Sequence, residues 1–381
     1  FKEEMTMEKF YNPVKIYQGK DSLQELKNTV NELAARNILL LTYHQDVMKH
    51  EVMNEVLDIL DQYHVVTKVF TVSNPDINDL YQLYNDTKDE SIDLVIAVGG
   101  GSVLDVAKSL CCLYADKDDS VNDIRHKIKN KQYKKPKCHW LDLPTTCGTG
   151  SEVTCWATIW DREQESKLSL ESQQNYAYAV FVDPRLLISM PKSLVVSSAL
   201  DATAHATEAY WAKHTNMISK IYALSAIQMI LPHLEAIMAG DQRLVHYDAL
   251  SKGSMLAGMA FSNTKTTACH SISYPLTLNY NIPHGAAVSL LIEPVMKKNL
   301  MILDNQEQLL SAFGVKNVDE LGSKIKNYLQ QVGIETSLKK WNVKKEDLKV
   351  LVSHCFTAGR MENNPRDLDE NDVYDILESI Y

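Results

Sequence analysis

Several features that would indicate other classes of protein are missing from this 381-residue sequence. It has no excess of positive charge, because 39 basic residues stand against 49 acidic ones and the formal net charge is −10. Binding to nucleic acid or to an anionic membrane surface is therefore not expected. No apolar run approaches the roughly 18 to 20 residues of a membrane helix, and the polar segment 1–9 lacks the apolar core of a signal peptide. We expect any anionic partner to be a small molecule that is held locally.

The cysteines also lack an organising pattern. They are odd in number and scattered, and no pair has CxxC spacing, so they match neither a secreted disulfide framework nor a zinc knuckle. A reducing compartment fits this usage, and we expect a cytoplasmic protein. The seven are Cys111, Cys112, Cys138, Cys147, Cys155, Cys269 and Cys355.

The chain has no internal repeat, no low-complexity tract and no Pro- or Gly-rich linker. Because one hydrophobic core rarely exceeds about 250 residues, this length suits two domains. Up to about residue 190, β-rich runs alternate with helical stretches, as in a parallel sheet wrapped by helices. The remainder reads as long helices rich in Ala, Leu and Met. We predict an α/β domain at 1–190 packed against an all-helical domain at 191–381, with a ligand cleft between them.

Individual elements follow from the apolar spacing in the first half. We expect the charged segment Asp116–Lys137 to be a solvated excursion rather than a binding tract. The predicted helices are Ser22–Ala35 and Ser102–Leu113, and the predicted strands are Asn37–Thr42, His64–Phe70, Asp93–Val98, His139–Leu143 and Ala179–Val182.

Three consecutive glycines, Gly99, Gly100 and Gly101, follow an apolar run and precede a helix opened by Ser102. Glycines let backbone N–H groups approach an anion closely, and a helix N-terminus adds partial positive charge. The turn therefore suits a pyrophosphate, although a purely structural turn would also use glycines. The spacing is not GxGxxG, because Leu104 occupies the place of the third glycine, so the common dinucleotide fingerprint is not met.

A second polar cluster, Pro144–Glu152, also follows an apolar run. The hydroxyls of Thr145, Thr146 and Thr149 suit phosphate or ribose oxygens. Alternatively, Thr149 and Glu152 form a capping box at a helix entry. The two interpretations are compatible, because a cap and an anion site use the same N–H groups.

Candidate metal ligands occur in the second half. Asp201 and His205 are four residues apart and share one face of a helix. His270 and His284 follow, 14 residues apart. One carboxylate and three imidazoles suit Zn²⁺ or Fe²⁺, and Glu208 is placed to orient a ligand from behind. Spacing alone leaves the alternative that each histidine is an ordinary core or surface residue.

Taken together, these motifs resemble the iron-containing (group III) alcohol dehydrogenase family. The resemblance covers nearly the whole chain and implies an N-terminal Rossmann-like dinucleotide-binding domain and a C-terminal helical metal-binding domain. The motifs are Gly99–Lys108, Pro144–Thr154, Asp201–His205, His270, Pro283–Gly285 and Asn364–Arg366.

The resemblance also implies site residues. Asp201, His205, His270 and His284 match the four ligands of a divalent metal, Fe²⁺ or Zn²⁺. A second set falls where the family holds NAD(P)H. That set comprises Tyr43 at the end of the first strand, together with Asn74, Gly100, Gly101, Ser102, Thr145, Thr146, Thr149, Thr154 and Lys167.

Two positions depart from the family pattern. The Asp that usually closes the first strand and repels a 2′-phosphate is replaced by Tyr43, so exclusion of NADP(H) is not assured. Asp46 is near enough in sequence to substitute for it. Four residues after His270, where many relatives carry a proton-relaying His, this chain has Tyr274.

Within the family, short segments are most similar to phosphonoacetaldehyde reductases, which reduce a short phosphonate-bearing aldehyde to 2-hydroxyethylphosphonate. They include Ala157–Asp161, Lys167–Leu170, Lys265–Thr277 and Asn363–Pro365. A dianion is costly to desolvate unless it is paired. Lys265 is the candidate cation, with Thr266 and Thr267 as neutral donors, and a solvated surface lysine is the alternative.

We predict metal-dependent, NAD(P)H-linked reduction of a short aldehyde to a primary alcohol. The metal would stabilise the developing alkoxide, and Tyr274, solvent or a cofactor hydroxyl would supply the proton. A general short-chain alcohol dehydrogenase of the same family, a dehydroquinate synthase-like lyase and an inactive nucleotide-binding protein are the alternatives. A homodimer is the family expectation.

Overall fold

The computed structural model describes residues 7–164 and 166–381, which form two compact units. The α/β unit spans Asn12–Ser189. The helical unit spans Met190–Tyr381 together with the N-terminal segment that ends at Tyr11. Residues 7–11 therefore belong to the unit that the chain completes last.

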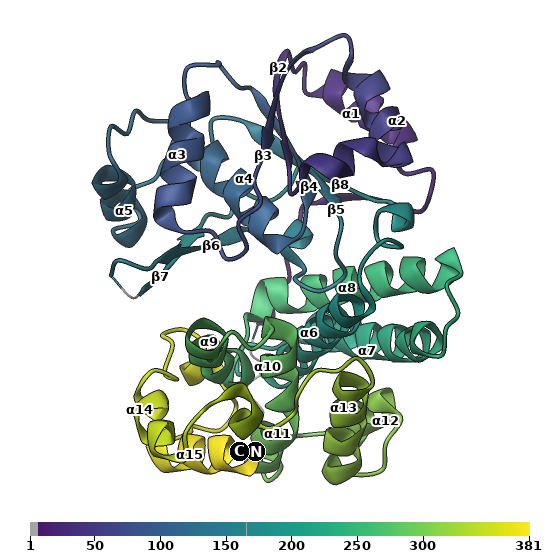
Figure 1. The fold of residues 1–381 in the computed structure, drawn as a ribbon, viewed down its shortest axis with the longest axis vertical. Helices are drawn as coiled ribbons and strands as arrows, with labels where there is room; N and C mark the ends of the chain where they lie inside the picture. The colour runs from purple at the N-terminus through teal and green to yellow at the C-terminus, as the bar shows by residue number, and fades with distance from the viewer. Residues whose placement is uncertain (1–6, 165) are drawn as a thin grey trace. The chain divides into compact units, whose positions relative to one another are not determined.

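The α/β unit is built on a parallel sheet. Among the described residues it has six strands in the order β1-β8-β5-β4-β2-β3, and neighbouring strands run parallel (Figure 1). Strand β4 is fully buried, and β2 is an apolar run that is buried except at its first residue, as parallel strands covered on both faces should be. The strands are β1 Lys15–Gln18, β2 Asn37–Thr42, β3 His64–Val69, β4 Leu94–Gly99, β5 His139–Pro144 and β8 Ala179–Val182.

Helices connect these strands, and an antiparallel hairpin of β6 (Trp156–Asp161) and β7 (Ser166–Glu171) forms a second, two-stranded sheet. One apolar cluster joins the sheet, the hairpin and helices α3, α4 and α5, and includes Leu41, Val95 and Ile159. The helices are α1 Gln24–Glu32, α2 Glu51–Leu60, α3 Ile77–Thr87, α4 Gly101–Leu113 and α5 Val121–Lys129, with short 3₁₀ turns at Gln45–Lys49, Ser151–Val153 and Pro184–Leu186.

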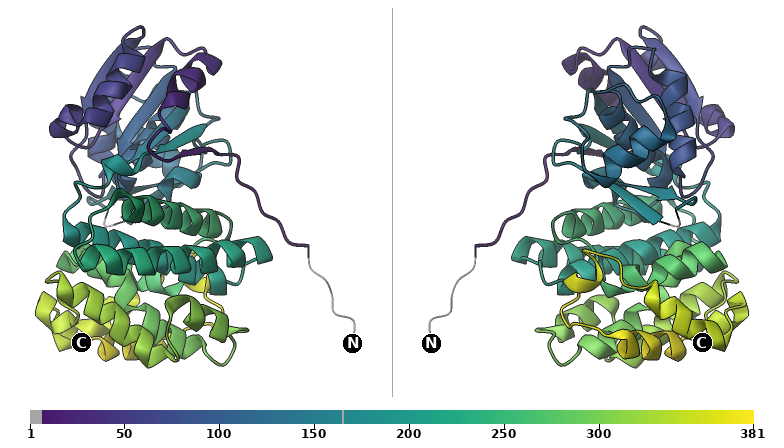
Figure 2. Two further views of the ribbon diagram at one scale, coloured as in Figure 1. Left: turned by 90° about the vertical axis from the view of Figure 1, so that its right-hand side faces the viewer. Right: turned by 90° about the vertical axis from the view of Figure 1, so that its left-hand side faces the viewer.

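In the helical unit every regular element of the described part is a helix. The longest three, α6, α7 and α8, pack along one another (Figure 2). The α-helices are α6 Lys192–Trp211, α7 Met217–Met238, α8 Leu244–Thr264, α9 Ala268–Tyr280, α10 His284–Leu290, α11 Ile292–Asn299, α12 Gln306–Phe313, α13 Val318–Gln331, α14 Leu348–Ser353 and α15 Glu370–Ser379. The 3₁₀ turns are η4 Leu338–Trp341, η5 Lys345–Asp347 and η6 Met361–Asn363.

Helix α7 corrects one sequence expectation. The sequence was expected to contain no apolar run of the length of a membrane helix. Judged by length and composition alone, however, α7 is long and apolar enough to cross a membrane. The core helix of a soluble protein can have the same length and composition. Ala223, Ile227, Ile230 and Leu234 repeat at helical spacing and are buried on the face that packs in this unit. We interpret α7 as a core helix.

The N-terminal segment is tied to α7 and α8. The backbone N–H of Tyr11 donates to Asn263 Oδ1 at 2.8 Å, and Asn263 Nδ2 donates back to the Tyr11 carbonyl at 3.1 Å. Glu8 accepts a hydrogen bond from the N–H of Met217, the first residue of α7, at 3.0 Å. This carboxylate satisfies one of the donors that a helix N-terminus leaves open.

The fold class is confirmed, and the predicted strands agree with the observed ones to within a residue at their ends. A second expectation is wrong. The charged segment Asp116–Lys137 is not merely a solvated excursion, because it contains α5, whose Ile124 and Ile128 are buried in the core. Arg125 of the same helix donates to the buried Asp161 at 2.6 Å. Strand β1 and the β6–β7 hairpin were not expected.

Candidate active site

Three helices carry the predicted metal ligands. Asp201 and His205 lie on α6, four residues apart, His270 lies on α9, and His284 is the first residue of α10. Gly285 explains how α10 approaches α6 so closely, since a Cβ added there would lie 1.9 Å from the Ser197 carbonyl oxygen. Only glycine permits this backbone contact. It places His284 beside Asp201.

The ligand atoms converge on one carboxylate oxygen. Asp201 Oδ1 lies 3.5 Å from His270 Nε2, 3.8 Å from His284 Nε2 and 3.8 Å from His205 Nδ1. Ligand atoms of Asp201, His270 and His284 all lie within 4.8 Å of one another, as ligands of one ion would. The fourth predicted ligand, His205, stacks on the ring of His270 with centroids 4.4 Å apart. It lies beside the three-residue group but outside it.

Two buried atoms in this cluster lack hydrogen-bond partners among the described residues, namely Asp201 Oδ1 and His270 Nε2. Leaving such atoms unsatisfied is costly unless they bind something else. A divalent cation fits, because carboxylate oxygen and imidazole nitrogen are ligands for Zn²⁺ and Fe²⁺. His284 is 34% exposed at its side chain, whereas Asp201 and His270 are below 10%, so the site is reached from the His284 side.

Glu208 supports His270 from behind. Its Oε2 contacts His270 Nδ1, and its Oε1 accepts from the His270 backbone N–H at 3.2 Å and from the Thr267 hydroxyl at 2.8 Å. Trp211 Nε1 donates to that hydroxyl at 2.9 Å. A proton held at Nδ1 by the carboxylate leaves Nε2 for a cation. The predicted orienting role of Glu208 thus applies to His270, 62 residues away.

The pKa values of the residues in this cluster are set by burial and by the neighbouring charged side chains. Burial disfavours the charged form of His270, but the Glu208 and Asp201 carboxylates outweigh it and raise its pKa to about 10. For His205 burial wins and lowers the pKa to about 4. The Asp201 carboxyl is also buried, yet the facing imidazoles hold its pKa well below its usual range. Asp201 is therefore a carboxylate at neutral pH.

Of the two predicted catalytic residues, Tyr274 contacts the metal-ligand cluster, whereas Lys265 is related to it through the chain. The Tyr274 ring is stacked on His284, with centroids 6.0 Å apart and an interplanar angle of 6°. Lys265 lies in the α8–α9 connection, two residues before Thr267. Of the neutral donors predicted beside it, Thr267 is already engaged with Glu208 and Trp211, which corrects that expectation. The Thr266 hydroxyl is buried and has no partner among the described residues.

In the α/β unit the predicted cofactor residues gather at the carboxyl edge of the sheet. β2 pairs with β3 on one side and with β4 on the other, so the chain reverses its direction of winding there. Parallel sheets bind ligands at such a switch point. Tyr43 follows β2, Gly100 follows β4 and Thr145 follows β5, all at this edge. Helix α4 starts here without a side-chain cap, leaving its first N–H groups open.

The glycines keep the two loops of this edge close together. A Cβ on Gly100 would lie 3.1 Å from the Thr146 side chain, and one on Gly101 would lie 2.8 Å from that of Thr149. The Thr145 N–H donates to the Gly99 carbonyl at 3.0 Å. The two polar motifs of the sequence therefore form one surface.

Of the remaining predicted residues, Asn74 and Ser102 are neighbours, since the Asn74 N–H donates to Ser102 Oγ at 3.2 Å. Lys167, in β7, has its Nζ 5.8 Å from the Trp160 ring centroid. Thr154 differs from expectation, because it is 1% exposed and its hydroxyl accepts from Lys108 Nζ at 3.1 Å. Any effect of Thr154 on a bound cofactor is therefore indirect. The alternative capping box is also wrong, because only a short 3₁₀ turn, Ser151–Val153, forms there.

Two charged residues of α4, Asp105 and Lys108, support this edge and were not among the predicted functional residues. Asp105 of α4 accepts from the Ser151 hydroxyl and from the Thr158 N–H, both at 2.9 Å. Lys108 is fully buried and donates to Ser151 Oγ at 2.7 Å. The signal was available, since Asp105 and Lys108 lie three residues apart within the quoted Gly99–Lys108 motif. They anchor α4 to the Pro144–Thr154 loop.

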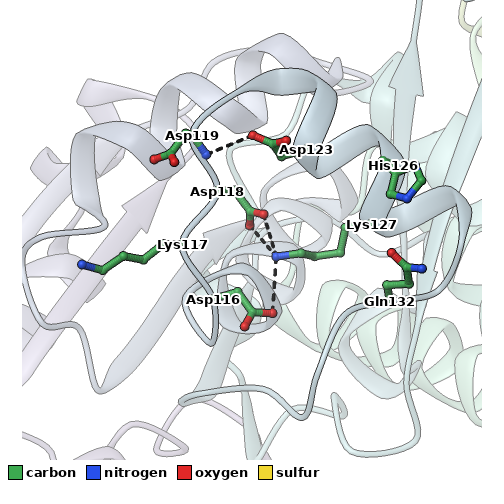
Figure 3. A pocket seen from close by; sticks show the side chains of 8 residues that line it. All are labelled: Asp116, Lys117, Asp118, Asp119, Asp123, His126, Lys127 and Gln132. Carbon is green, nitrogen blue, oxygen red and sulfur yellow. Dashed lines mark hydrogen bonds and ion pairs between the residues drawn. The ribbon is translucent and has the colours of Figure 1, made fainter.

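A hollow elsewhere in the α/β unit is lined by acidic and basic residues of the α4–α5 connection, of α5 and of the segment that follows it (Figure 3). Lys127 Nζ lies 2.7 Å from Asp118 and 3.4 Å from Asp116, so these carboxylates are neutralised by a residue of the chain itself. Nothing in this hollow points to a ligand.

Comparison with known proteins agrees with the geometry. Residues 13–184 match the family model described as iron-containing alcohol dehydrogenase, and residues 195–381 match the C-terminal model of the same family. The chain is 28% identical to the NADPH-dependent butanol dehydrogenase of Clostridium saccharobutylicum, with 98% of each chain covered. It is 25% identical to the sulfoacetaldehyde reductase of Bilophila wadsworthia, covering 97% of this chain and 98% of that one.

Among solved structures, the sulfoacetaldehyde reductase from Bifidobacterium kashiwanohense in complex with NAD⁺ superposes with a TM-score of 0.88 at 26% identity, covering 98% and 99% of the two chains. The family models between them match nearly the whole chain, and their boundary falls close to that between the two units. Such membership selects the oxidoreductase over the lyase alternative. This chain belongs to the iron-containing alcohol dehydrogenase family.

Proposed function

We propose that the protein catalyses the metal-dependent, NAD(P)H-linked reduction of a short aldehyde that carries an anionic head group, with phosphonoacetaldehyde as the specific candidate. The observation that carries the proposal is the convergence of ligand atoms of Asp201, His270 and His284, two of which are buried without a hydrogen-bond partner among the described residues. When bound, a divalent cation there polarises the carbonyl, and NAD(P)H supplies the hydride.

The metal would be held by Asp201, His270 and His284, with His205 as the predicted fourth ligand. Asp201 supplies the negative charge, and Glu208 fixes the orientation of the His270 ring. The ligand types accept Fe²⁺ or Zn²⁺, because sites of this kind select poorly by affinity.

The dinucleotide would lie at the carboxyl edge of the sheet. The open N–H groups at the start of α4 suit its pyrophosphate, and Thr146 and Thr149 line the neighbouring loop. Tyr43 stands where an acidic residue would exclude a 2′-phosphate. Asp46 does not replace that residue simply, because its carboxylate lies 2.8 Å from Lys49 Nζ. We therefore propose that NADPH is accepted as well as NADH.

Lys265 and Thr266 are proposed to receive the anionic head group. Both precede Thr267, whose hydroxyl is bonded to Glu208 and so connects this loop to the ligand His270. The Thr266 hydroxyl is buried and has no partner among the described residues, as expected of a donor reserved for a ligand. Two of the relatives act on sulfoacetaldehyde by name, a short aldehyde with an anionic group, which supports this substrate class.

The product alkoxide needs a proton, and Tyr274 is the proposed donor. Its ring lies parallel to that of His284, on the side from which the site is reached. Solvent or a ribose hydroxyl of the cofactor is the alternative. A phenol with a pKa of about 10 donates slowly unless a nearby cation lowers that value.

The test is a screen of NADPH and NADH oxidation in metal-replete buffer. Phosphonoacetaldehyde, sulfoacetaldehyde and an uncharged aldehyde of similar size are compared by kcat/KM. Preference for phosphonoacetaldehyde supports the full proposal. Preference for sulfoacetaldehyde keeps the anionic class and changes the substrate, whereas preference for the uncharged compound leaves a general alcohol dehydrogenase of the family, as the butanol dehydrogenase relative suggests.

Two further parts of the proposal concern the setting of the enzyme. All seven cysteines are buried and free, which suits the reducing cytoplasm. The proposed assembly is a homodimer, and sedimentation equilibrium of the purified protein tests it.

A further inference from the structure

The connection between α8 and α9 holds a lysine in an unusual backbone conformation. Lys265 has φ 62° and ψ 178°, a region that glycine adopts readily and residues with a Cβ do not. Such a conformation persists only when the surrounding structure imposes it. The residues around Lys265 therefore hold the loop against its own preference.

Asn363, a residue distant in sequence, contributes to that restraint. It acts beside two local bonds: the Lys265 N–H donates to the Phe261 carbonyl at 2.8 Å, and the Thr264 hydroxyl donates to the Lys265 carbonyl at 2.9 Å. Asn363 Nδ2 donates to the Thr264 carbonyl at 2.8 Å and to the Thr266 carbonyl at 3.0 Å, so a single amide bridges the residues on either side of Lys265. Asn363 is 4% exposed. Because both carbonyls must face the same donor, the backbone between them cannot relax to an ordinary conformation.

Asn363 is itself fixed. Its Oδ1 accepts from the His214 N–H at 3.3 Å, and its carbonyl accepts from the Lys213 N–H at 2.9 Å. Both donors follow directly after α6, the helix that carries Asp201. The amide therefore relates the Lys265 loop to the end of the helix that supplies the central metal ligand.

We propose that Asn363 is a positioning residue that holds Lys265 in its strained conformation and thereby sets the preference of the site for anionic aldehydes. The inference rests on the proposed function. If the loop were flexible, binding of the head group would order it and so lose conformational entropy. Because Asn363 already fixes the loop before binding, that entropy loss does not oppose binding of the head group.

The first test is Asn363→Ala, read as the ratio of kcat/KM for the anionic aldehyde to that for an uncharged aldehyde of similar size. We expect this ratio to fall about 10-fold, because a charge-assisted contact loses its alignment. Asn364→Ala is the matched control, since its amide donates instead to Asn299 Oδ1 and the Arg366 carbonyl. Its ratio should stay as in the wild type. An unchanged ratio in Asn363→Ala, or an equal fall in both variants, overturns the proposal.

The second test measures the backbone strain at Lys265 through melting temperatures and does not depend on enzymatic activity. Lys265→Gly and Lys265→Ala both lose the ammonium group, but only glycine adopts this positive φ without steric strain. We expect Lys265→Gly to melt about 2 to 4 °C above Lys265→Ala. Adding Asn363→Asp, which keeps the acceptor for His214 but removes both donations, should abolish that difference. Equal melting temperatures of the two Lys265 variants, or a difference that survives in the Asn363→Asp background, contradict the proposed restraint.

Lys265→Met separates this inference from the proposed function. If it leaves the ratio for the two aldehydes unchanged, Lys265 does not bind the head group, and that part of the proposed function fails. If it lowers the ratio while Asn363→Ala does not, Lys265 binds the anion without help from Asn363, and only the present inference fails.

Discussion

At the carboxyl edge of the sheet, the first backbone N–H groups of α4 have no side-chain cap among the described residues, whereas in the helical unit side-chain atoms of Asp201 and His270 have no hydrogen-bond partner there. The first arrangement suits an anion and the second suits a cation. Backbone sites depend on the absence of side chains, and metal sites depend on their presence. Removing a side chain should therefore damage mainly the metal site, whereas adding one should damage the dinucleotide site and, in the helical unit, only the places where two backbones touch.

The largest effect is expected from removing a side chain of the helical unit. His270→Ala should lose the bound divalent metal and lower kcat by about 10³-fold or more, because Lewis-acid stabilisation supplies several kcal/mol. Metal content by mass spectrometry and NAD(P)H binding by fluorescence should be measured together. Full turnover without metal would refute the site, and loss of NAD(P)H binding would show that the two sites are not independent.

Adding a side chain should also damage the metal centre where two backbones touch. Gly285→Ala places a Cβ 1.9 Å from the Ser197 carbonyl oxygen, so α10 must move away from α6 and take His284 with it. We expect metal affinity to fall about 10- to 100-fold, as for other losses of ligand orientation. Gly240→Ala is a steric control, since nothing lies within 4 Å of its added Cβ, although its φ of +99° adds strain. Equal metal affinity in both variants would count against the close-contact explanation.

In the α/β unit, adding a side chain should affect the dinucleotide alone. Gly101→Ala brings a Cβ to 2.8 Å from the Thr149 side chain and separates the two loops. The dissociation constant for NAD(P)H should rise about 10-fold, equivalent to roughly 1.4 kcal/mol, while metal content stays at the wild-type level. A variant that binds NAD(P)H normally would show that this turn is structural only.

A smaller effect is expected for Tyr274→Phe. We expect kcat to fall by less than the roughly 10²-fold typical of losing a general acid, because solvent or a ribose hydroxyl can donate instead. The pH–rate profile is the informative measurement. A profile identical to that of the wild type would mean that the phenol carries no proton.

The smallest effect concerns stability of the helical unit away from the site. His233 and His246 face each other with Nδ1 atoms 2.8 Å apart. Burial first, and then the neighbouring His246, lower the pKa of His233 below its ordinary 6.5, with Asp248 opposing them. The unfolded chain then binds the proton more readily, so the free energy of unfolding should fall as pH drops below about 6.5. His233→Gln should show a shallower decline of melting temperature between pH 7.5 and 5.5, and parallel curves would argue against this linkage.

The two units also differ in how far their sites could be predicted. The strands β2 and β8 match prediction at both ends, because buried parallel strands are continuous apolar runs. Helix α5 was missed because its buried Ile124 and Ile128 are separated by charged residues. The glycine turn carries its own local signal, since strand, turn and helix are consecutive.

The metal centre has no such local signal beyond the Asp201–His205 spacing. Its remaining ligands were assigned through resemblance to a family, not from periodicity. Neither the contact of Glu208 with His270 nor the bonds of Asn363 to the Lys265 loop could be predicted, since they join residues 62 and about 100 positions apart. Contacts between side chains of distant helices depend on packing, which no short sequence window contains.

The ties between the N-terminal segment and helices α7 and α8 have a practical consequence for anyone who wishes to divide this protein. A protein expressed from Met190 onward would lack residues 7–11, which form hydrogen bonds with helices α7 and α8. A purification tag or a proteolytic cut near residue 10 would likewise disturb helices α7 and α8, which lie far along the sequence. The helical half is better obtained by joining residues 7–11 back to it through a designed linker than by simple truncation.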